Sequence, residues 1–179
     1  MRSMEERTLA TTYPFRGRRI SLRLDEVERD DGHRTTREIV EHPGAVAILA
    51  WDGQRVAMVR QWRHAVGRTL LEIPAGTLEP DEPPAETARR ELAEEVGLAA
   101  AAWEAGPGFF TAPGFCDERM HLFLATELRE ADGDAAADPD EQIEPSWLPL
   151  DDALEACEDG RIEDGKTIAA LGWLARRLR

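Results

Sequence analysis

The chain has 179 residues, enough for one ordinary domain with a substantial core. A composition of 42% hydrophobic and 32% charged residues is typical of a globular protein rather than a disordered one. The formal net charge of −14 and the isoelectric point near 4.7 argue against nucleic acid or an anionic membrane as a partner. An acidic protein that binds a phosphate ester therefore has to supply local cations, either arginine side chains or a metal ion.

The two cysteines, Cys116 and Cys157, match no metal-ligand spacing and form no disulfide framework. We expect them to be small buried hydrophobic residues in a reducing compartment. Residues 1–15 lack the apolar core of a signal peptide, and no apolar run approaches the roughly 18 residues of a spanning helix. The sequence therefore predicts a cytoplasmic protein.

Short strands are predicted in the first part of the chain. Residues 19–27 alternate apolar and polar side chains, turn at 29–33 and return as 34–42, which indicates a hairpin. Two apolar runs, 44–51 and 55–62, flank the turn at residues 52–54 and predict a second hairpin. The segment 70–76 is a further extended stretch.

From Pro84 to Val96 the apolar period changes to that of a helix, which begins after a proline pair and ends before Gly97. A strand at 119–128, an acidic loop at 130–145 and a short strand at 146–150 follow, and the last helices are expected at 151–158 and 166–177. No internal repeat is present. This mixture of strands and segregated helices predicts the α+β class.

The predicted helix is unusually acidic. The seventeen residues from Glu79 to Glu95 hold seven carboxylates and two arginines. Glu91, Glu94 and Glu95 occupy neighbouring positions on one side of the helix, where like charges repel. Two explanations compete: a solvated charged face, or a site for a hard divalent cation, which prefers oxygen ligands and bridges carboxylates to phosphates.

The complete spacing decides between them. Gly76, five residues, Glu82, seven residues, and then the run 90–98, "RELAEEVGL", resemble the Nudix hydrolase signature at every fixed position. The resemblance implies a Nudix fold: a mixed β-sheet sandwiched between helices, with an N-terminal antiparallel β-hairpin arm. It divides the chain into an arm at 1–42 and a Nudix domain at 43–179, with the signature at 76–98.

The residues of the signature can be interpreted physically. Gly76 permits a tight reversal between strand and helix, and Arg90 can hold carboxylates by charge-assisted hydrogen bonds. In the family the implied metal ligands are the Ala75 carbonyl, Glu91 and Glu95, with Glu94 in support. The implied cofactor is Mg²⁺, with Mn²⁺ as a possible substitute.

The flanks resemble the ADP-ribose pyrophosphatase branch, because Pro113 lies fifteen residues past Leu98 within "TAPGF". That resemblance implies substrate contacts by Arg37 and Glu38, and by Gly114 and Phe115. Arg63 is a candidate phosphate contact, although an arginine that covers the sheet is the alternative. The branch also implies a homodimer with a swapped N-terminal arm, in which an aromatic residue such as Tyr13 or Phe15 could stack on adenine or simply pack.

The catalytic base is expected in the acidic loop. Counting back from Trp147, the resemblance selects Glu141, with Asp140 as the alternative. Pro139 departs from the commoner spacing of two glutamates, which leaves two alternatives: Glu141 acts as both metal ligand and base, or Glu94 or Glu95 takes part. The resulting expectation is hydrolysis of ADP-ribose to AMP and ribose 5-phosphate without a covalent intermediate. GDP-mannose or ADP-glucose hydrolysis and a non-catalytic nucleotide sensor are the alternatives.

Overall fold

The computed structural model describes residues 4–132 and 142–179. It divides into two compact units, one of residues 1–44 and 110–119 and the other of residues 45–109 and 120–179. The second unit carries the acidic helix. The first contains the N-terminal strands together with a loop that lies much later in the sequence.

The first unit is built on an antiparallel sheet of β1 (Glu6–Arg16), β2 (Ser21–Arg29) and β3 (Arg34–Glu41). The predicted hairpin of β2 and β3 is confirmed, with Leu24 opposite Glu38. The sequence does not predict β1, which is exposed at nearly every residue and has two irregularities in its register with β2. The arm is therefore a three-stranded sheet rather than a hairpin alone.

The second unit contains two sheets. The larger has the order β7 (Ala75–Thr77), β4 (Ala45–Ala50), β10 (Arg119–Glu130) and β8 (Leu98–Ala105), and β9 (Phe109–Phe110) also pairs with β10. Strands β4 and β10 are parallel, whereas β7 and β8 are antiparallel to their neighbours. The smaller sheet is antiparallel, with β5 (Arg55–Arg63) between β11 (Ile143–Pro149) and β6 (Arg68–Glu72), and the short helix η1 (His64–Val66) joins β5 to β6.

The predicted hairpin of residues 44–62 is wrong. Strands β4 and β5 meet only at the bridge between Trp51 and Val56, and then continue in different sheets. Both edges of β4 are occupied by β7 and β10, and both edges of β5 by β11 and β6. Every residue of β4 is buried, as expected of a central strand with both faces covered.

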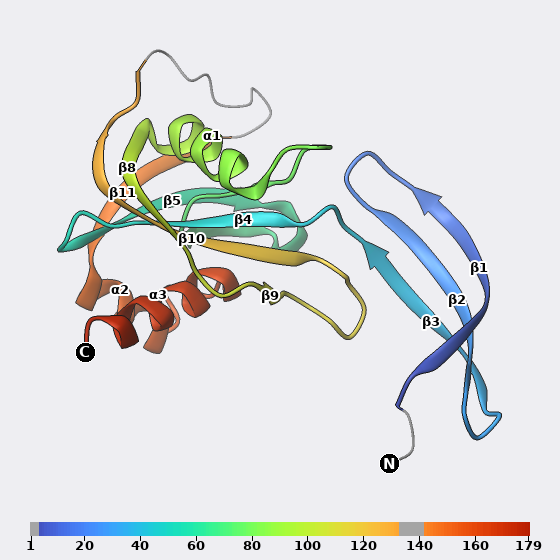
Figure 1. Cartoon of the computed structure of the whole chain (residues 1–179). Coiled ribbons are helices and arrows are strands. Elements are labelled where there is room, and N and C mark those ends of the chain that lie inside the picture. The colour runs from blue at the N-terminus through green and yellow to red at the C-terminus, as the bar shows by residue number, and fades with distance from the viewer. Residues whose placement is uncertain (1–3, 133–141) are drawn as a thin grey trace. The chain divides into compact units, whose positions relative to one another are not determined.

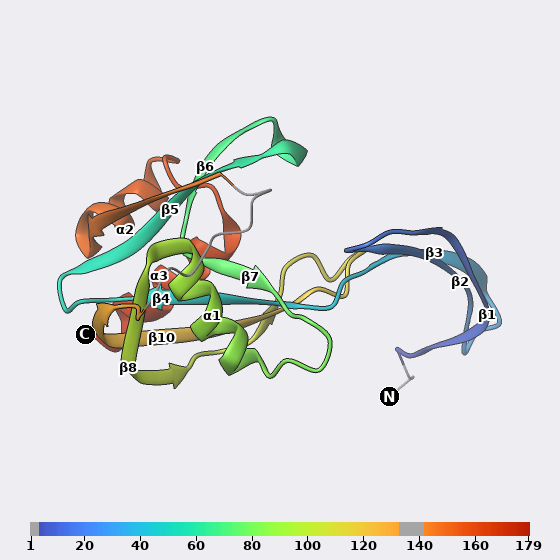
Figure 2. The ribbon, with the colours of Figure 1, turned by 90° about the horizontal axis from the view of Figure 1, so that it is seen from above.

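Helix α1 (Pro84–Val96) covers one side of this sheet core, and α2 (Leu150–Glu158) and α3 (Gly165–Arg177) cover the other (Figures 1 and 2). Alternate residues of β4 belong to two separate clusters. Val46 and Ile48 pack with Leu92 of α1, while the other face of the strand packs with α2 and α3. The expected α+β class, with strands sandwiched between helices, is confirmed.

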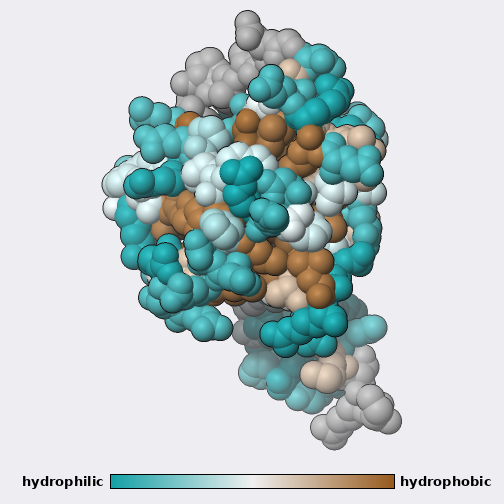
Figure 3. Space-filling view, turned by 90° about the vertical axis from the view of Figure 1, so that its left-hand side faces the viewer, coloured by the Kyte–Doolittle hydropathy of each residue, from teal (hydrophilic) through white to brown (hydrophobic). Residues whose placement is uncertain are grey.

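The remaining surface features are simple. Hydrophilic side chains surround smaller hydrophobic patches on the face seen in Figure 3.

Cys116 and Cys157 are free but only half-buried, so the expectation of buried cysteines is met in part. Within the described residues, no helix combines the length and the apolar character needed to cross a membrane.

Candidate functional site

Helix α1 has the bounds that its sequence predicts. Pro84 occupies the first helical position, where a missing N–H costs nothing. At the other end Gly97 adopts φ of 71°, and its N–H donates to the Ala93 carbonyl at 3.0 Å. The rotation of the helix is set by its apolar face, because Ala88 and Leu92 pack with Val46 and Ile48 of β4, and this rotation decides which glutamates face the sheet.

Arg90 lies at the centre of the acidic face of α1. Its Nε and Nη2 donate to the two carboxylate oxygens of Glu82 at 3.1 and 3.0 Å. Its Nη1 donates to Glu91 at 2.8 Å and to Glu94 at 2.9 Å. The hydrogen bonds from Arg90 hold the pKa of Glu82 below its ordinary value, and those carboxylates raise the pKa of Arg90.

Glu91 lies directly against the backbone of Gly76. A Cβ atom added to Gly76 would be 2.0 Å from the carboxyl carbon of Glu91, so the Glu91 side chain would have to move away. The expectation that Gly76 provides a chain reversal is wrong, because this glycine lies within β7 and its φ is not in the left-handed region. Its role is to leave room for the Glu91 carboxylate.

Glu95 completes this contact between α1 and β7. Its side chain is buried, and one carboxylate oxygen accepts a hydrogen bond from the Ala75 N–H at 2.9 Å. The backbone of Ala75 and Gly76 therefore lies beside both predicted metal-binding glutamates. Two carboxylates and a main-chain carbonyl are hard oxygen donors, and this donor set fits Mg²⁺.

No group of three or more acidic, histidine or cysteine side chains is arranged to hold a metal within the part of the chain that the structure describes. The expected set needs only two such side chains from α1, because a third ligand is a main-chain carbonyl. The fourth expected ligand, Glu141, lies outside the described residues, as does the alternative base Asp140.

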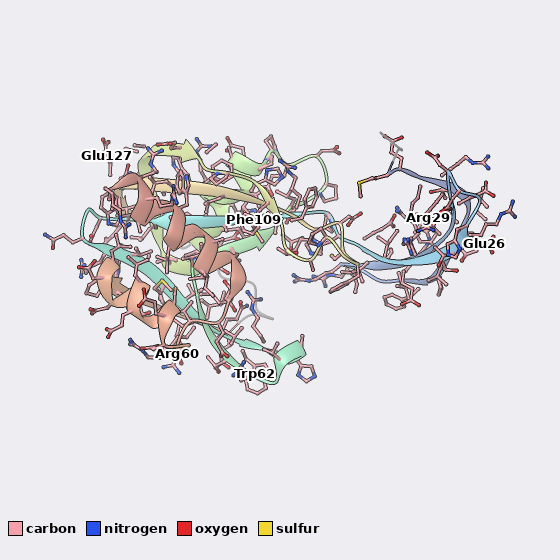
Figure 4. The ribbon with its side chains drawn as sticks, turned by 90° about the horizontal axis from the view of Figure 1, so that it is seen from below. Glu26, Arg29, Arg60, Trp62, Phe109 and Glu127 are labelled. Carbon is pink, nitrogen blue, oxygen red and sulfur yellow. The ribbon has the colours of Figure 1, made fainter. Side chains whose placement is uncertain are left out.

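Arg63 is held by a residue that the sequence analysis did not select. Its Nε and Nη2 each donate at 2.7 Å to Glu72, a buried carboxylate at the end of β6. Lys166 of α3 also donates to Glu72 and lies 3.1 Å from Asp164. The neighbouring Trp62 is exposed and projects outward from β5 (Figure 4).

Two signals could have identified Glu72 and Lys166 before the structure was known. Glu72 is a single carboxylate within the otherwise apolar run 70–75, and such a residue needs a cationic partner if the strand is buried. Lys166 is the only lysine of the chain. Neither signal names the partner, because the two residues are 94 positions apart.

The first unit contains a pocket of about 410 Å³. Its lining includes four predicted substrate-binding residues: Arg37, Glu38, Gly114 and Phe115. The loop reaches β3 because Val40 donates its N–H to the Phe115 carbonyl and accepts from the Asp117 N–H, at 2.8 and 3.2 Å.

Arg23 is a lining residue that the sequence analysis missed. Its Nε donates to Asp25 at 3.0 Å and its Nη1 to Glu41 at 2.6 Å. Glu41 also accepts from the hydroxyl of Tyr13. The two aromatic candidates for stacking thus differ, because Tyr13 is held in this network while Phe15 is 54% exposed.

The comparisons with known proteins agree with this geometry. The family model described as the NUDIX domain matches residues 41–171. The chain belongs to the NUDIX family. This NUDIX protein is similar to an ADP-ribose pyrophosphatase of Bacillus subtilis (strain 168), with 44% identity over 97% of the chain and 95% of the relative.

Two further relatives are about equally similar. An ADP-ribose pyrophosphatase of Mycobacterium tuberculosis (strain ATCC 25618 / H37Rv) is 42% identical over 92% of the NUDIX chain and 80% of the relative. A methanol dehydrogenase activator of Bacillus methanolicus is 42% identical over 95% and 92%. Among solved structures, a crystal structure of an ADP compounds hydrolase matches the fold with a TM-score of 0.84, at 23% identity over 99% of this chain and 97% of the other.

Proposed function

We propose that this NUDIX hydrolase cleaves the pyrophosphate of ADP-ribose, giving AMP and ribose 5-phosphate. The observation that carries the proposal is the cluster of α1, in which Glu91 and Glu95 lie against the backbone of Ala75 and Gly76 while Arg90 holds Glu82, Glu91 and Glu94. The near full-length similarity to ADP-ribose pyrophosphatases supports the choice of substrate.

The cofactor that suits this cluster is Mg²⁺, and Mn²⁺ could replace it. Glu91, Glu95, the Ala75 carbonyl and Glu141 would hold the cation. A bound divalent cation neutralises the diphosphate and lowers the pKa of bound water. Arg90 keeps the carboxylates of Glu91 and Glu94 in place, as its hydrogen bonds to both indicate.

The other proposed roles belong to residues that touch the diphosphate or the attacking water. Arg63 would contact the phosphate oxygens and stabilise the negative charge that develops on them. Glu141 would accept the proton of the water that attacks phosphorus, with Asp140 or Glu94 as the alternative. AMP and ribose 5-phosphate then leave, and no protein side chain forms a covalent bond to phosphorus.

The pocket of the first unit is proposed to bind the adenosine part of a substrate. Arg37 and Glu38 offer a donor and an acceptor for adenine or ribose groups, and Phe115 offers an exposed ring. A homodimer is part of the proposal, because the β1 strand is solvent-exposed almost throughout and the arm carries exposed Leu9, Phe15 and Ile20. Gel filtration with light scattering would test the dimer.

The substrate is tested by measuring product release in Mg²⁺ from ADP-ribose, GDP-mannose, ADP-glucose and NADH. ADP-ribose is expected to have the highest kcat/KM of the panel. A clear preference for GDP-mannose or ADP-glucose would keep the NUDIX chemistry and overturn the substrate. Binding of ADP-ribose without turnover would indicate a sensor instead of an enzyme.

The base is tested by a pair of neighbouring substitutions. Glu141→Gln is expected to lower kcat by about 10²-fold or more, since a positioned base contributes on the order of 10² to 10⁴. Asp140→Asn is the matched control and should retain activity. The opposite result would assign the base to Asp140, and activity in both variants would leave Glu94 or Glu95 as the candidate.

A further inference from the structure

Glu72 is a buried carboxylate that uses both oxygens to hold one guanidinium. Only 1% of the residue is exposed, and it accepts from Nε and Nη2 of Arg63 at 2.7 Å each. A bidentate pair of this kind determines the plane of the guanidinium as well as its position. Arg63 is therefore oriented by a group that no substrate can reach.

Lys166 contacts the same carboxylate from the first turn of α3. Its side chain is 9% exposed, it donates to Glu72, and its Nζ lies 3.1 Å from Asp164. Asp164 caps α3 by accepting from the Thr167 N–H at 2.9 Å. Lys166 is thus placed by the beginning of the helix and is already paired with two carboxylates of its own protein.

A second contact attaches the same turn of α3 to the chain beside Glu72. The Thr167 hydroxyl accepts a hydrogen bond from the Ile73 N–H at 2.9 Å, and Thr167 is buried. Two residues further on, the Ala75 N–H donates to Glu95 of the α1 cluster. The segment 72–75 therefore connects the residues around Arg63 to the proposed metal ligands.

The outer edge of Arg63 remains accessible. Glu72 is the only hydrogen-bond partner of its guanidinium among the described residues, and 38% of the side chain is exposed. The hydrogen bond with Glu72 is the main cause that raises the pKa of Arg63, and the charge of Glu95 adds to it. Arg63 thus lies within electrostatic range of the α1 cluster and has an Nη1 group available to an anion.

We infer that Glu72 and Lys166 are positioning residues for Arg63. Glu72 holds the Nε and Nη2 edge so that Nη1 faces the diphosphate, and Lys166 holds Glu72. The inference rests on the proposed function, because the phosphate contact of Arg63 is part of it. The competing explanation is that Arg63 and Lys166 only neutralise a buried carboxylate.

The test compares kcat and KM of Glu72→Gln and Lys166→Met with those of the wild type, on the diphosphate that the wild type cleaves fastest. An amide cannot accept both N–H groups of Arg63, so kcat is expected to fall by about 10²-fold in Glu72→Gln, with a smaller change in KM. In Lys166→Met the expected fall in kcat is about 10-fold.

Glu163→Gln is the matched control. Glu163 pairs with Arg68 at 2.9 Å and so also connects β6 to the chain before α3, but at an exposed position that does not involve Arg63. Its kcat is expected to equal that of the wild type. A melting temperature for each variant verifies that kcat is compared between folded proteins.

A double-mutant cycle separates positioning from a merely structural role. In an Arg63→Ala background, Glu72→Gln is expected to cause no further fall in kcat, because its effect passes through Arg63. Independent, multiplying effects on kcat, or a lower melting temperature with unchanged kcat, would overturn the inference while the proposed function stands. A wild type that hydrolyses no diphosphate of the panel would instead overturn the proposed function itself, and the inference with it.

Discussion

Two charged clusters of the second unit have opposite compositions. On α1 a single guanidinium, Arg90, bonds to three carboxylates, while the nearby Glu95 has its oxygen on the Ala75 N–H. Between β5, β6 and α3 a single carboxylate, Glu72, accepts from two cations. The first cluster is partly accessible, since Arg90 is 28% and Glu94 30% exposed, whereas Glu72 is almost completely buried.

The difference shows how one fold can provide a site for a divalent cation and, separately, an oriented arginine for a phosphate group. The carboxylates of α1 outnumber their arginine and repel each other, which is a cost that an added divalent cation removes. The charges around Glu72 are balanced by Arg63, Lys166 and Asp164, so this cluster needs no added ion. It can hold an arginine in one orientation while the edge of that arginine stays accessible.

The largest expected effect comes from removing one carboxylate of the acidic cluster. Glu91→Gln should lower the rate of ADP-ribose hydrolysis on the order of 10³-fold, because a proposed metal ligand and an anionic acceptor for Arg90 are lost together. The matched control is Glu86→Gln on the same helix, whose carboxylate is 63% exposed and pairs with Arg89 at 3.0 Å. Equal rates in the two variants would show that α1 carries only a solvated charged face.

A smaller effect is expected when the same carboxylate is displaced instead of removed. Gly76→Ala introduces a Cβ at 2.0 Å from Glu91 and should move that side chain by an ångström or more, lowering kcat by about 10²-fold. Gly172→Ala in α3, where an added Cβ contacts nothing within 4 Å, is the control. Full activity of Gly76→Ala would contradict the close packing of Glu91 against β7.

The smallest expected effect concerns the acid stability of the buried cluster. Burial alone would raise the pKa of Glu72, but the hydrogen bond from Arg63 and the charge of Lys166 outweigh it, and the pKa lies below its ordinary 4.5. A carboxyl whose pKa is lower in the folded state than in the unfolded chain stabilises the fold at pH values above its ordinary pKa. This contribution disappears as the pH falls from the ordinary pKa through the lowered pKa of the folded state.

Urea unfolding of the wild type and of Glu72→Gln at pH 7 and pH 3 measures this contribution. The wild type should exceed the variant in stability at pH 7. The difference should shrink at pH 3, because this pH lies below the ordinary pKa of 4.5 and the unfolded chain then binds a proton at Glu72. Glu163→Gln, on an exposed pair, should show almost no difference at either pH. A difference in stability that does not change with pH would mean that Glu72 stabilises the fold by packing rather than by its charge.

The sequence predicted the parts of the site that lie close together along the chain. Glu91, Glu94 and Glu95 share one side of α1 because residues three and four apart are neighbours on any α-helix. The ends of that helix also depend on adjacent residues, and the structure places them at Pro84 and Val96 as expected. The family followed from the same short-range spacing.

Predictions from the local sequence pattern were wrong where the pairing of strands depends on competition between segments that are distant in the sequence. The turn after β4 predicts a hairpin, yet β7 and β10 occupy both edges of β4. Strand β8 contains four consecutive alanines, which favour helix locally, and it becomes a strand because β10 supplies its backbone hydrogen bonds. The role of Gly76 was also misjudged, since the side chain that requires a glycine comes from another element.

By itself, then, the sequence determined the family, the bounds of the acidic helix and which glutamates share one side of it, because residues three and four apart are neighbours on a helix. Only the tertiary structure decided that Glu72 holds Arg63 and Lys166, the latter from 94 positions away, and that Phe115 is joined to Val40 beside the pocket of the first unit. No local pattern encodes such contacts. Each forms between segments that are far apart in the sequence, and it depends on which of the competing segments loses least conformational entropy when it is brought into contact.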